Sequence, residues 1–169
     1  MAIKLSFNER WILSNQYRIL ALLDPQSKDH YEQVGEVLER GYTLNYSWVT
    51  DYIAEDHEVM SEDSCREVID ILAMFDQLRW HFDKLTDKAG VEESKIRFLG
   101  FDGNNEGDQM GYAMYLQKTG RFTDLKGHNN SMNSHMPTMS RYRNMLREWH
   151  ASKDQNNLSK EDLIRIGAA

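Results

Sequence analysis

The segment 61–85 carries the longest strongly periodic apolar pattern in the chain. Its apolar side chains recur at spacings of three and four residues, which is the period of one face of an α-helix. They are Val68, Ile71, Leu72, Phe75, Leu78, Phe82 and Leu85. Ser61 is a favourable N-cap, and Glu62 and Asp63 place negative charge in the first turn, where the helix dipole favours it. The sequence therefore predicts a long helix over 61–85.

A second, weaker apolar stripe runs along the same segment. It consists of Ile69, Ala73 and Trp80, and a polar ridge of Asp70, Gln77, His81 and Lys84 separates it from the first. A helix that is apolar on two sides needs neighbours on both, so we expect this helix to be central. Because a chain with modest helices leaves part of such a surface uncovered, the second stripe also predicts a homo-oligomer, with a dimer favoured.

Start and stop signals predict shorter helices around the central one. Ser6 and Glu9 form a capping box, and Asp24 followed by Pro25 ends that helix. A second helix is expected to begin near Asp29 and Glu32 and to end at Gly41. Four more are expected over about 47–55, 104–118, 137–149 and 159–166. Asn104 or Asn105 is the expected cap of the helix over 104–118.

Two further stretches are not assigned to long helices. Residues 86–95 are expected to form a loop or a short helix, and residues 96–101 an extended run without an obvious partner strand. The prediction is an all-α fold, a single multihelical domain of about seven helices that spans residues 1–169.

Composition limits the classes of function. The chain has 169 residues and a net charge of −7, which disfavours a nucleic-acid binder because such proteins usually carry a basic surface. A single cysteine, Cys65, cannot form an intramolecular disulfide. The N-terminus lacks a signal-peptide core, and no run approaches the roughly 18 apolar residues of a membrane span. We expect a soluble, cytoplasmic protein that does not associate with membranes.

The richest polar pattern lies in two segments, FDGNNE at 101–106 and NSH at 133–135. The candidate ligand-binding residues are Asp102, Asn104, Asn105, Glu106, Asn133 and His135, with His128 nearby in sequence. Carboxylates with imidazoles can hold a metal or perform acid–base chemistry. Asp, Asn and Gly are equally the residues of a tight turn followed by a capped helix, and this second interpretation is favoured. No catalytic residue, metal ligand or cofactor is assigned.

Other polar residues fit ordinary roles. His81 and Asp70 are expected on a solvated face or as ion-pair partners, and Cys65 as a buried, inert thiol. The sequence contains no GxSxG, HExxH, Walker A or dinucleotide-binding motif.

Several stretches together resemble the YfbU family of bacterial proteins. They are RWILSNQYRIL at 10–20, ERGY at 39–42, EVIDILAMF at 67–75, FLGFDGNNE at 98–106 and NSHMPTMSRYRNMLREW at 133–149. The resemblance covers nearly the whole chain, and FLGFD is its most specific part. It implies an all-helical, cytoplasmic, self-associating protein, and it implies no biochemical activity.

Two hypotheses of function follow. The favoured one is a non-catalytic, self-associating interaction or regulatory protein. The alternative is a small-ligand- or metal-dependent enzyme whose site combines the FDGNNE and NSH segments. The observation that separates them best is whether residues 133–135 pack over residues 102–106 around a cavity.

Overall fold

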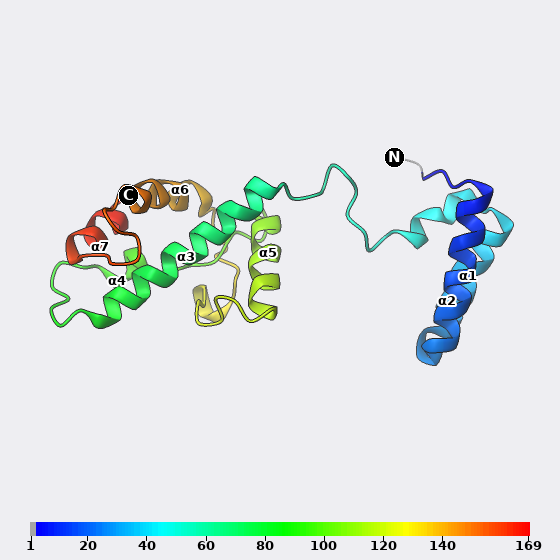
Figure 1. The fold of residues 1–169 in the computed structure, drawn as a ribbon, viewed down its shortest axis with the longest axis horizontal. Helices are drawn as coiled ribbons and strands as arrows, with labels where there is room; N and C mark the ends of the chain where they lie inside the picture. Colours follow the sequence, from blue (N-terminus) through cyan, green and yellow to red (C-terminus); the bar gives the residue numbers. More distant parts are fainter. Residues whose placement is uncertain (1–2) are drawn as a thin grey trace. The chain divides into compact units, whose positions relative to one another are not determined.

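The computed structural model describes residues 3–169, apart from the side chain of His128, and these residues are organised as helices and loops (Figure 1). The α-helices are α1 (Phe7–Leu23), α2 (Lys28–Arg40), α3 (Glu62–Lys84), α4 (Glu93–Ile96), α5 (Gly107–Lys118), α6 (Met139–His150) and α7 (Lys160–Gly167). Three short 3₁₀ helices are η1 (Pro25–Ser27), η2 (Thr43–Val49) and η3 (His128–Asn130). Within the described residues the only strand-like pairing is an isolated parallel bridge between Phe101 and Asn133. The prediction of an all-α fold is confirmed.

The packing of the chain divides into two compact units, Met1–Val59 and Met60–Ala169. Each unit has its own core and is described by itself below. That the whole chain forms one domain stays a prediction.

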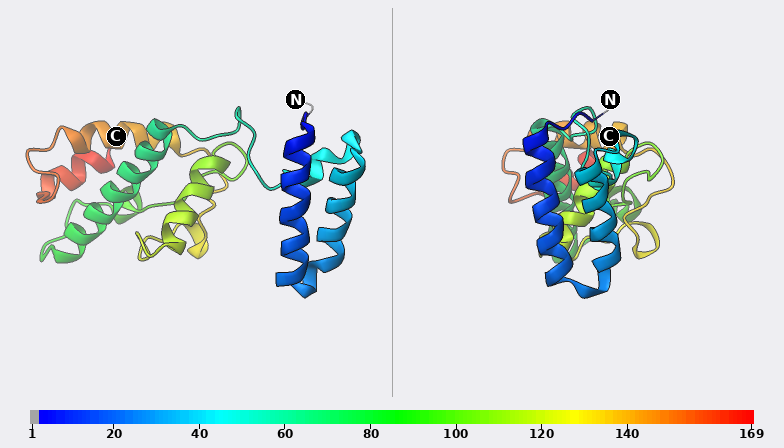
Figure 2. Two further views of the ribbon diagram at one scale, coloured as in Figure 1. Left: turned by 45° about the vertical axis from the view of Figure 1, so that its right-hand side comes forward. Right: turned by 90° about the vertical axis from the view of Figure 1, so that its right-hand side faces the viewer.

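The first unit is a hairpin of α1 and α2, which lie side by side in both views of Figure 2. The predicted capping box starts α1: Ser6 Oγ accepts from the Glu9 N–H at 3.3 Å, and Glu9 Oε2 accepts from the Ser6 N–H at 2.7 Å. Gly41 ends α2 with φ +73°, the left-handed conformation that glycine adopts at low cost. The small core of this unit is Tyr17, Val34, Leu38 and Val49.

The predicted helix over 47–55 is wrong. The structure has the 3₁₀ helix η2 there, which begins earlier and ends at Val49, and residues 50–59 form turns and irregular backbone. Thr43, Tyr46 and Val49 are branched or aromatic residues of low helix propensity, and Tyr46 and Val49 are buried. The start of α2 also differs from expectation, because it follows Ser27 without a side-chain cap.

The second unit is built around α3, which packs against α4, α5, α6 and α7. Ser61 caps it as predicted, with Oγ accepting from the Ser64 N–H at 3.1 Å. Six residues of the predicted stripe are buried and Leu85 is half-buried. The central-helix prediction is confirmed within this unit.

The second stripe of α3 differs from expectation. Ile69 and Ala73 are half-buried and pack against the core of the same unit. Trp80 is 48% exposed, and the Lys84 ammonium lies 3.3 Å from its ring centroid. Because two of its three residues have internal neighbours, this stripe no longer argues for a dimer interface.

The prediction that His81 lies on a solvated face is also wrong. His81 is only 6% exposed, and its Nδ1 lies 2.8 Å from the Gln77 carbonyl oxygen. The helix backbone thus supplies one hydrogen-bond partner for the ring, while the apolar part of the imidazole packs in the interior. Nε2 has no partner among the described residues.

Four aromatic rings hold the extended residues 97–101 inside the core, whereas Ile96, predicted to be extended, is the last residue of α4. Phe75, Phe98, Phe101 and Tyr142 contact one another, with the Phe75 and Tyr142 centroids 4.8 Å apart. The Tyr142 hydroxyl donates to the Gly100 carbonyl at 2.9 Å and accepts from the Leu99 N–H at 3.0 Å. Burial raises the pKa of Tyr142 to about 12, so this hydroxyl is a neutral donor at physiological pH.

Candidate functional site

The two polar segments singled out in the sequence lie against each other. The Phe101 N–H donates to the Met132 carbonyl at 2.8 Å, and the Ser134 N–H donates to the Phe101 carbonyl at 2.9 Å. Gly100 has φ +98°, and a Cβ there would clash with the Met132 carbonyl oxygen. Only glycine permits this approach, so the G of FLGFD is the residue that lets the NSH segment pack over the turn.

Asp102 organises the turn itself. It is 2% exposed, with Oδ1 accepting from the Asn104 N–H at 3.1 Å and Oδ2 from the Asn105 side-chain amide at 2.5 Å. This is the Asx-type turn of the favoured interpretation. The expected capping of α5 by Asn104 or Asn105 is wrong, because both serve Asp102 and α5 begins only after Glu106, at Gly107.

Glu106 is the most highly connected side chain of the site. It is 6% exposed, and Oε1 accepts from the N–H groups of Thr138 and Met139, each at 2.7 Å. Oε2 accepts from the Thr138 hydroxyl at 2.7 Å and from the Asp102 N–H at 2.9 Å. The Thr138 side chain makes no capping bond to its own helix, so Glu106 is the group that satisfies the N-terminus of α6.

The environment of Glu106 keeps its carboxylate charged. Burial alone raises the pKa of Glu106, but the hydrogen bonds from Asp102, Met139 and Thr138 outweigh burial and lower it below the usual 4.5. The positive end of the α6 dipole favours the same charged state.

Asn133 and His135 complete the contact between the segments. Asn133 Oδ1 accepts from the Gly103 N–H at 3.1 Å and from the His135 N–H at 2.9 Å. His135 is exposed and has a left-handed φ of +56°. The side chain of His128 lies outside the described residues.

The geometry brings the six candidate residues into one hydrogen-bonded network through their side chains or backbone. Asp102, Glu106 and Asn133 act through buried or half-buried side chains, whereas Asn104 and Asn105 are exposed and turn back toward Asp102. His135 joins the network only through its backbone N–H. In the part of the chain that the structure describes, no three His, Cys, Asp or Glu side chains are placed to hold a metal ion.

Sequence reasoning missed the role of Thr138 and the pairing of Glu106 with α6. Residues 106 and 138 are far apart in the sequence, whereas the capping patterns readable in a sequence span about three positions. One sequence signal could have indicated a remote cap: Pro137 marks a helix start, and no residue beside it is placed to cap that helix through its side chain.

The YfbU domain model matches residues 3–169. The chain belongs to the YfbU family. The match spans the helical hairpin and the larger unit alike, so both are parts of the YfbU domain. No described helix combines the length and apolar character needed to cross a bilayer.

Proposed function

We propose that this YfbU-family protein is a non-catalytic, self-associating interaction or regulatory protein of the bacterial cytoplasm, and that it dimerises through α1. The observation that carries the proposal is an apolar face of α1 that has no partner within its own unit. The face consists of Trp11, Ile12, Ile19, Leu22 and Leu23, each more than half exposed.

Helical geometry places this face opposite α2. The side chains of α1 that are buried in the hairpin are Ser14, Tyr17 and Ala21. At about 100° per residue, Ile12, Ile19 and Leu23 lie on the reverse side of the helix. Large exposed apolar patches of this kind mark interaction surfaces.

The chemistry of the face suits a second copy of the same chain. The residues interleaved with the apolar ones are Asn8, Asn15, Gln16 and Arg18, and the one charge among them, on Arg18, is paired with Glu39 of α2 at 2.7 Å. A two-fold axis brings identical surfaces together, so a charged face would oppose like charges in a chain of net charge −7. An apolar stripe whose one bordering charge is neutralised by its own chain limits that repulsion.

Light scattering of the full-length protein tests the proposal. We expect a dimer mass for wild type at micromolar concentration and a monomer mass for Ile19→Glu, because a carboxylate at the centre of the face would be buried against its own symmetry mate. Glutamate favours helix at least as well as isoleucine, so circular dichroism should stay unchanged. Met114→Glu, on an exposed position of α5, is the matched control and should remain dimeric. A monomeric wild type, or a dimeric Ile19→Glu, would overturn the proposal.

The contact between the FDGNNE and NSH segments motivates a second candidate, a small-ligand- or metal-dependent enzyme that uses Asp102, Asn105, Glu106 and His135. Thermal melts of wild type and Asp102→Asn in chelator and with added divalent metal separate the candidates. If Asp102 only organises the turn, neither protein shifts with metal and Asp102→Asn costs little stability. A rise in melting temperature with metal in wild type alone would favour the enzyme.

A further inference from the structure

A narrow seam runs along the middle of the α1 face that is proposed above as the dimer interface. Its residues follow one another at alternating spacings of four and three positions, the pattern by which one helix packs along another. They are Asn8, Ile12, Asn15, Ile19 and Leu22. At about 100° per residue these positions fall within one strip of the helix surface, turned away from the side that is buried against α2.

Asn15 interrupts this seam at its centre. Its side chain is half-buried and makes no hydrogen bond with a described residue of its own chain. Ile12 precedes it and Ile19 follows it in the seam, and each is more than half exposed. A second helix that covers the two isoleucines also covers the amide between them, and a buried amide without a partner costs free energy. The dimer therefore needs a hydrogen-bonding group opposite Asn15.

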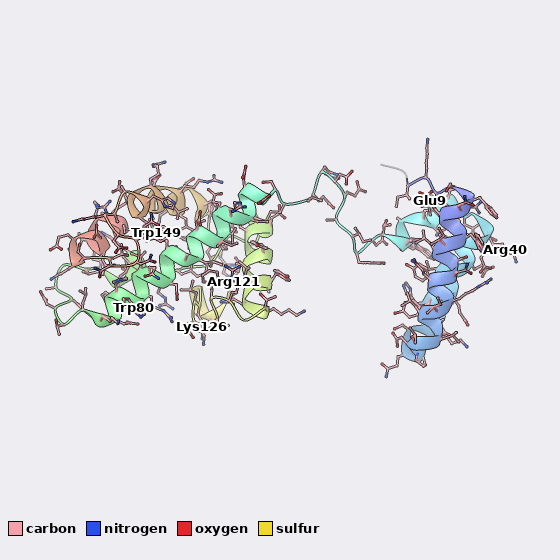
Figure 3. The ribbon with its side chains drawn as sticks, viewed as in Figure 1. Glu9, Arg40, Trp80, Arg121, Lys126 and Trp149 are labelled. Carbon is pink, nitrogen blue, oxygen red and sulfur yellow. The ribbon has the colours of Figure 1, made fainter. Side chains whose placement is uncertain are left out.

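The charged side chains of α1 are already engaged within their own unit. Glu9, which Figure 3 labels on α1, accepts from the Ser6 N–H at 2.7 Å. Arg10 donates to a backbone carbonyl of α2 at 3.3 Å, and Arg18 is paired with Glu39 at 2.7 Å. Charge pairs across the interface are therefore not what aligns the two copies, and the alignment is left to the uncharged seam.

Two-fold symmetry limits which group can face Asn15. Parallel helices related by such an axis place each seam residue opposite its own copy. Antiparallel helices that overlap fully do the same at the middle of α1, which is Asn15. The seam has one other amide, Asn8, but antiparallel helices reach that pairing only after a slide of about 10 Å, which leaves Ile19 and Leu22 beyond the end of the partner helix.

We infer that Asn15 lies on the two-fold axis of the dimer and hydrogen-bonds to Asn15 of the second copy. A primary amide carries a donor and an acceptor, so two facing copies exchange reciprocal N–H···O bonds. An apolar residue at this position would pack against any apolar helix, whereas the amide is satisfied only opposite a matching group. Asn15 thus selects a second copy of this chain as the partner of α1. The inference rests on the dimer proposed above.

Charge complementation followed by light scattering tests the inference. Asn15→Asp and Asn15→Lys each set like charges against each other, so each alone should give a monomer mass at the micromolar concentration where wild type is dimeric. An equimolar mixture of the two should recover the dimer mass, because opposite charges then meet across the interface. Gln16→Asp is the matched control, exposed and next in the sequence but off the seam, and should stay dimeric.

The outcomes separate this inference from the dimer itself. A dimeric Asn15→Asp, or a mixture that remains monomeric, would overturn the pairing of Asn15 while a monomeric Ile19→Glu kept the α1 interface. A monomeric wild type would overturn both.

Disulfide trapping gives an independent measurement. With the free Cys65 replaced by serine, Asn15→Cys should cross-link into a dimer on mild oxidation, because a disulfide needs Cα atoms within about 7 Å of each other. Gln16→Cys in the same background should cross-link about tenfold more slowly or worse, since its position lies off the seam. Equal rates for the two variants would count against Asn15 on the axis.

Discussion

At the scale of single residues, Glu106 connects the turn to the helix α6, which follows much later in the chain. Its carboxylate accepts four hydrogen bonds from Asp102, Thr138 and Met139 in a nearly dry environment. Each buried donor that loses its acceptor lowers the free energy of unfolding. Because all four donors share the Glu106 carboxylate, removing this one side chain leaves all of them without an acceptor.

Glu106→Ala should therefore lower the free energy of unfolding by about 3 kcal/mol or more, since several buried donors lose their partner together. Glu106→Gln keeps one acceptor oxygen and should cost less. Urea unfolding followed by circular dichroism measures both. Equal, small losses for the two variants would show that water satisfies the α6 N-terminus in place of the carboxylate.

The stabilisation from Glu106 should also depend on pH in a defined direction. The folded-state pKa of Glu106 lies below its usual 4.5, so the contribution is complete above that pH and is lost as the pH falls through the folded pKa. The difference in unfolding free energy between wild type and Glu106→Gln should be largest near neutral pH and shrink below about pH 4. A difference that stays constant as the pH is lowered to about 3 would contradict this assignment.

The structural roles of residues could be predicted from the sequence where they depend on near neighbours in the chain. The Ser6 and Glu9 capping box, the Gly41 C-cap and the Asp102 turn each depend on neighbours within a few positions, and each was predicted. The pairing of Glu106 with Thr138 depends on tertiary structure, and the burial of His81 depends on packing around α3. Neither leaves a local pattern.

At the scale of elements, α3 was the most predictable helix because its apolar period is long and its N-cap is strong. The elements that were predicted wrongly are short. The 43–49 segment carries residues of weak helix propensity, so its conformation is decided by burying Tyr46 and Val49 and not by intrinsic preference. The extended run was recognised from residue 97 onward, although Ile96 belongs to α4, but its packing against the rings of Phe75 and Tyr142 was not predicted.

Phe75 is the residue of α3 on which most of this packing depends. It is fully buried and contacts the rings of Phe98 and Tyr142. Phe75→Ala should cost about 3–5 kcal/mol of unfolding free energy, because it opens a cavity that the surrounding rings fill only partly. Chemical denaturation measures this loss, and a value below about 1 kcal/mol would show that the rings collapse onto the vacated space.

At the scale of the whole molecule, the chain contains two separately packed units where the sequence predicted helices gathered around one centre. Periodicity identifies which face of a helix is buried, but not which other helix buries it. The sequence does not say which helices cover α1 or α3, and only the structure shows that α3 packs with the helices after it while α1 packs with α2.

Limited proteolysis should report this division. Tyr52 is 79% exposed, and residues 50–59 have no regular helix. Because proteases need extended, accessible backbone, we expect chymotrypsin to cut first near Tyr52 and a glutamate-specific protease near Glu55 or Glu58. Mass spectrometry should find fragments that end in this segment before any cut within α3. Early cleavage within residues 7–49 or within residues 62–169 would contradict the packing described here.

The remote capping of α6 has a consequence for how the chain reaches its native state. Thr138 provides no side-chain cap of its own, so the first turn of α6 obtains its acceptor only when the 102–106 turn has closed across the intervening residues. Closing such a loop costs entropy before it returns any enthalpy, which makes contacts of this kind late and slow relative to local ones. We therefore expect the first turn of α6 to become fixed late in folding, after the 102–106 turn has formed.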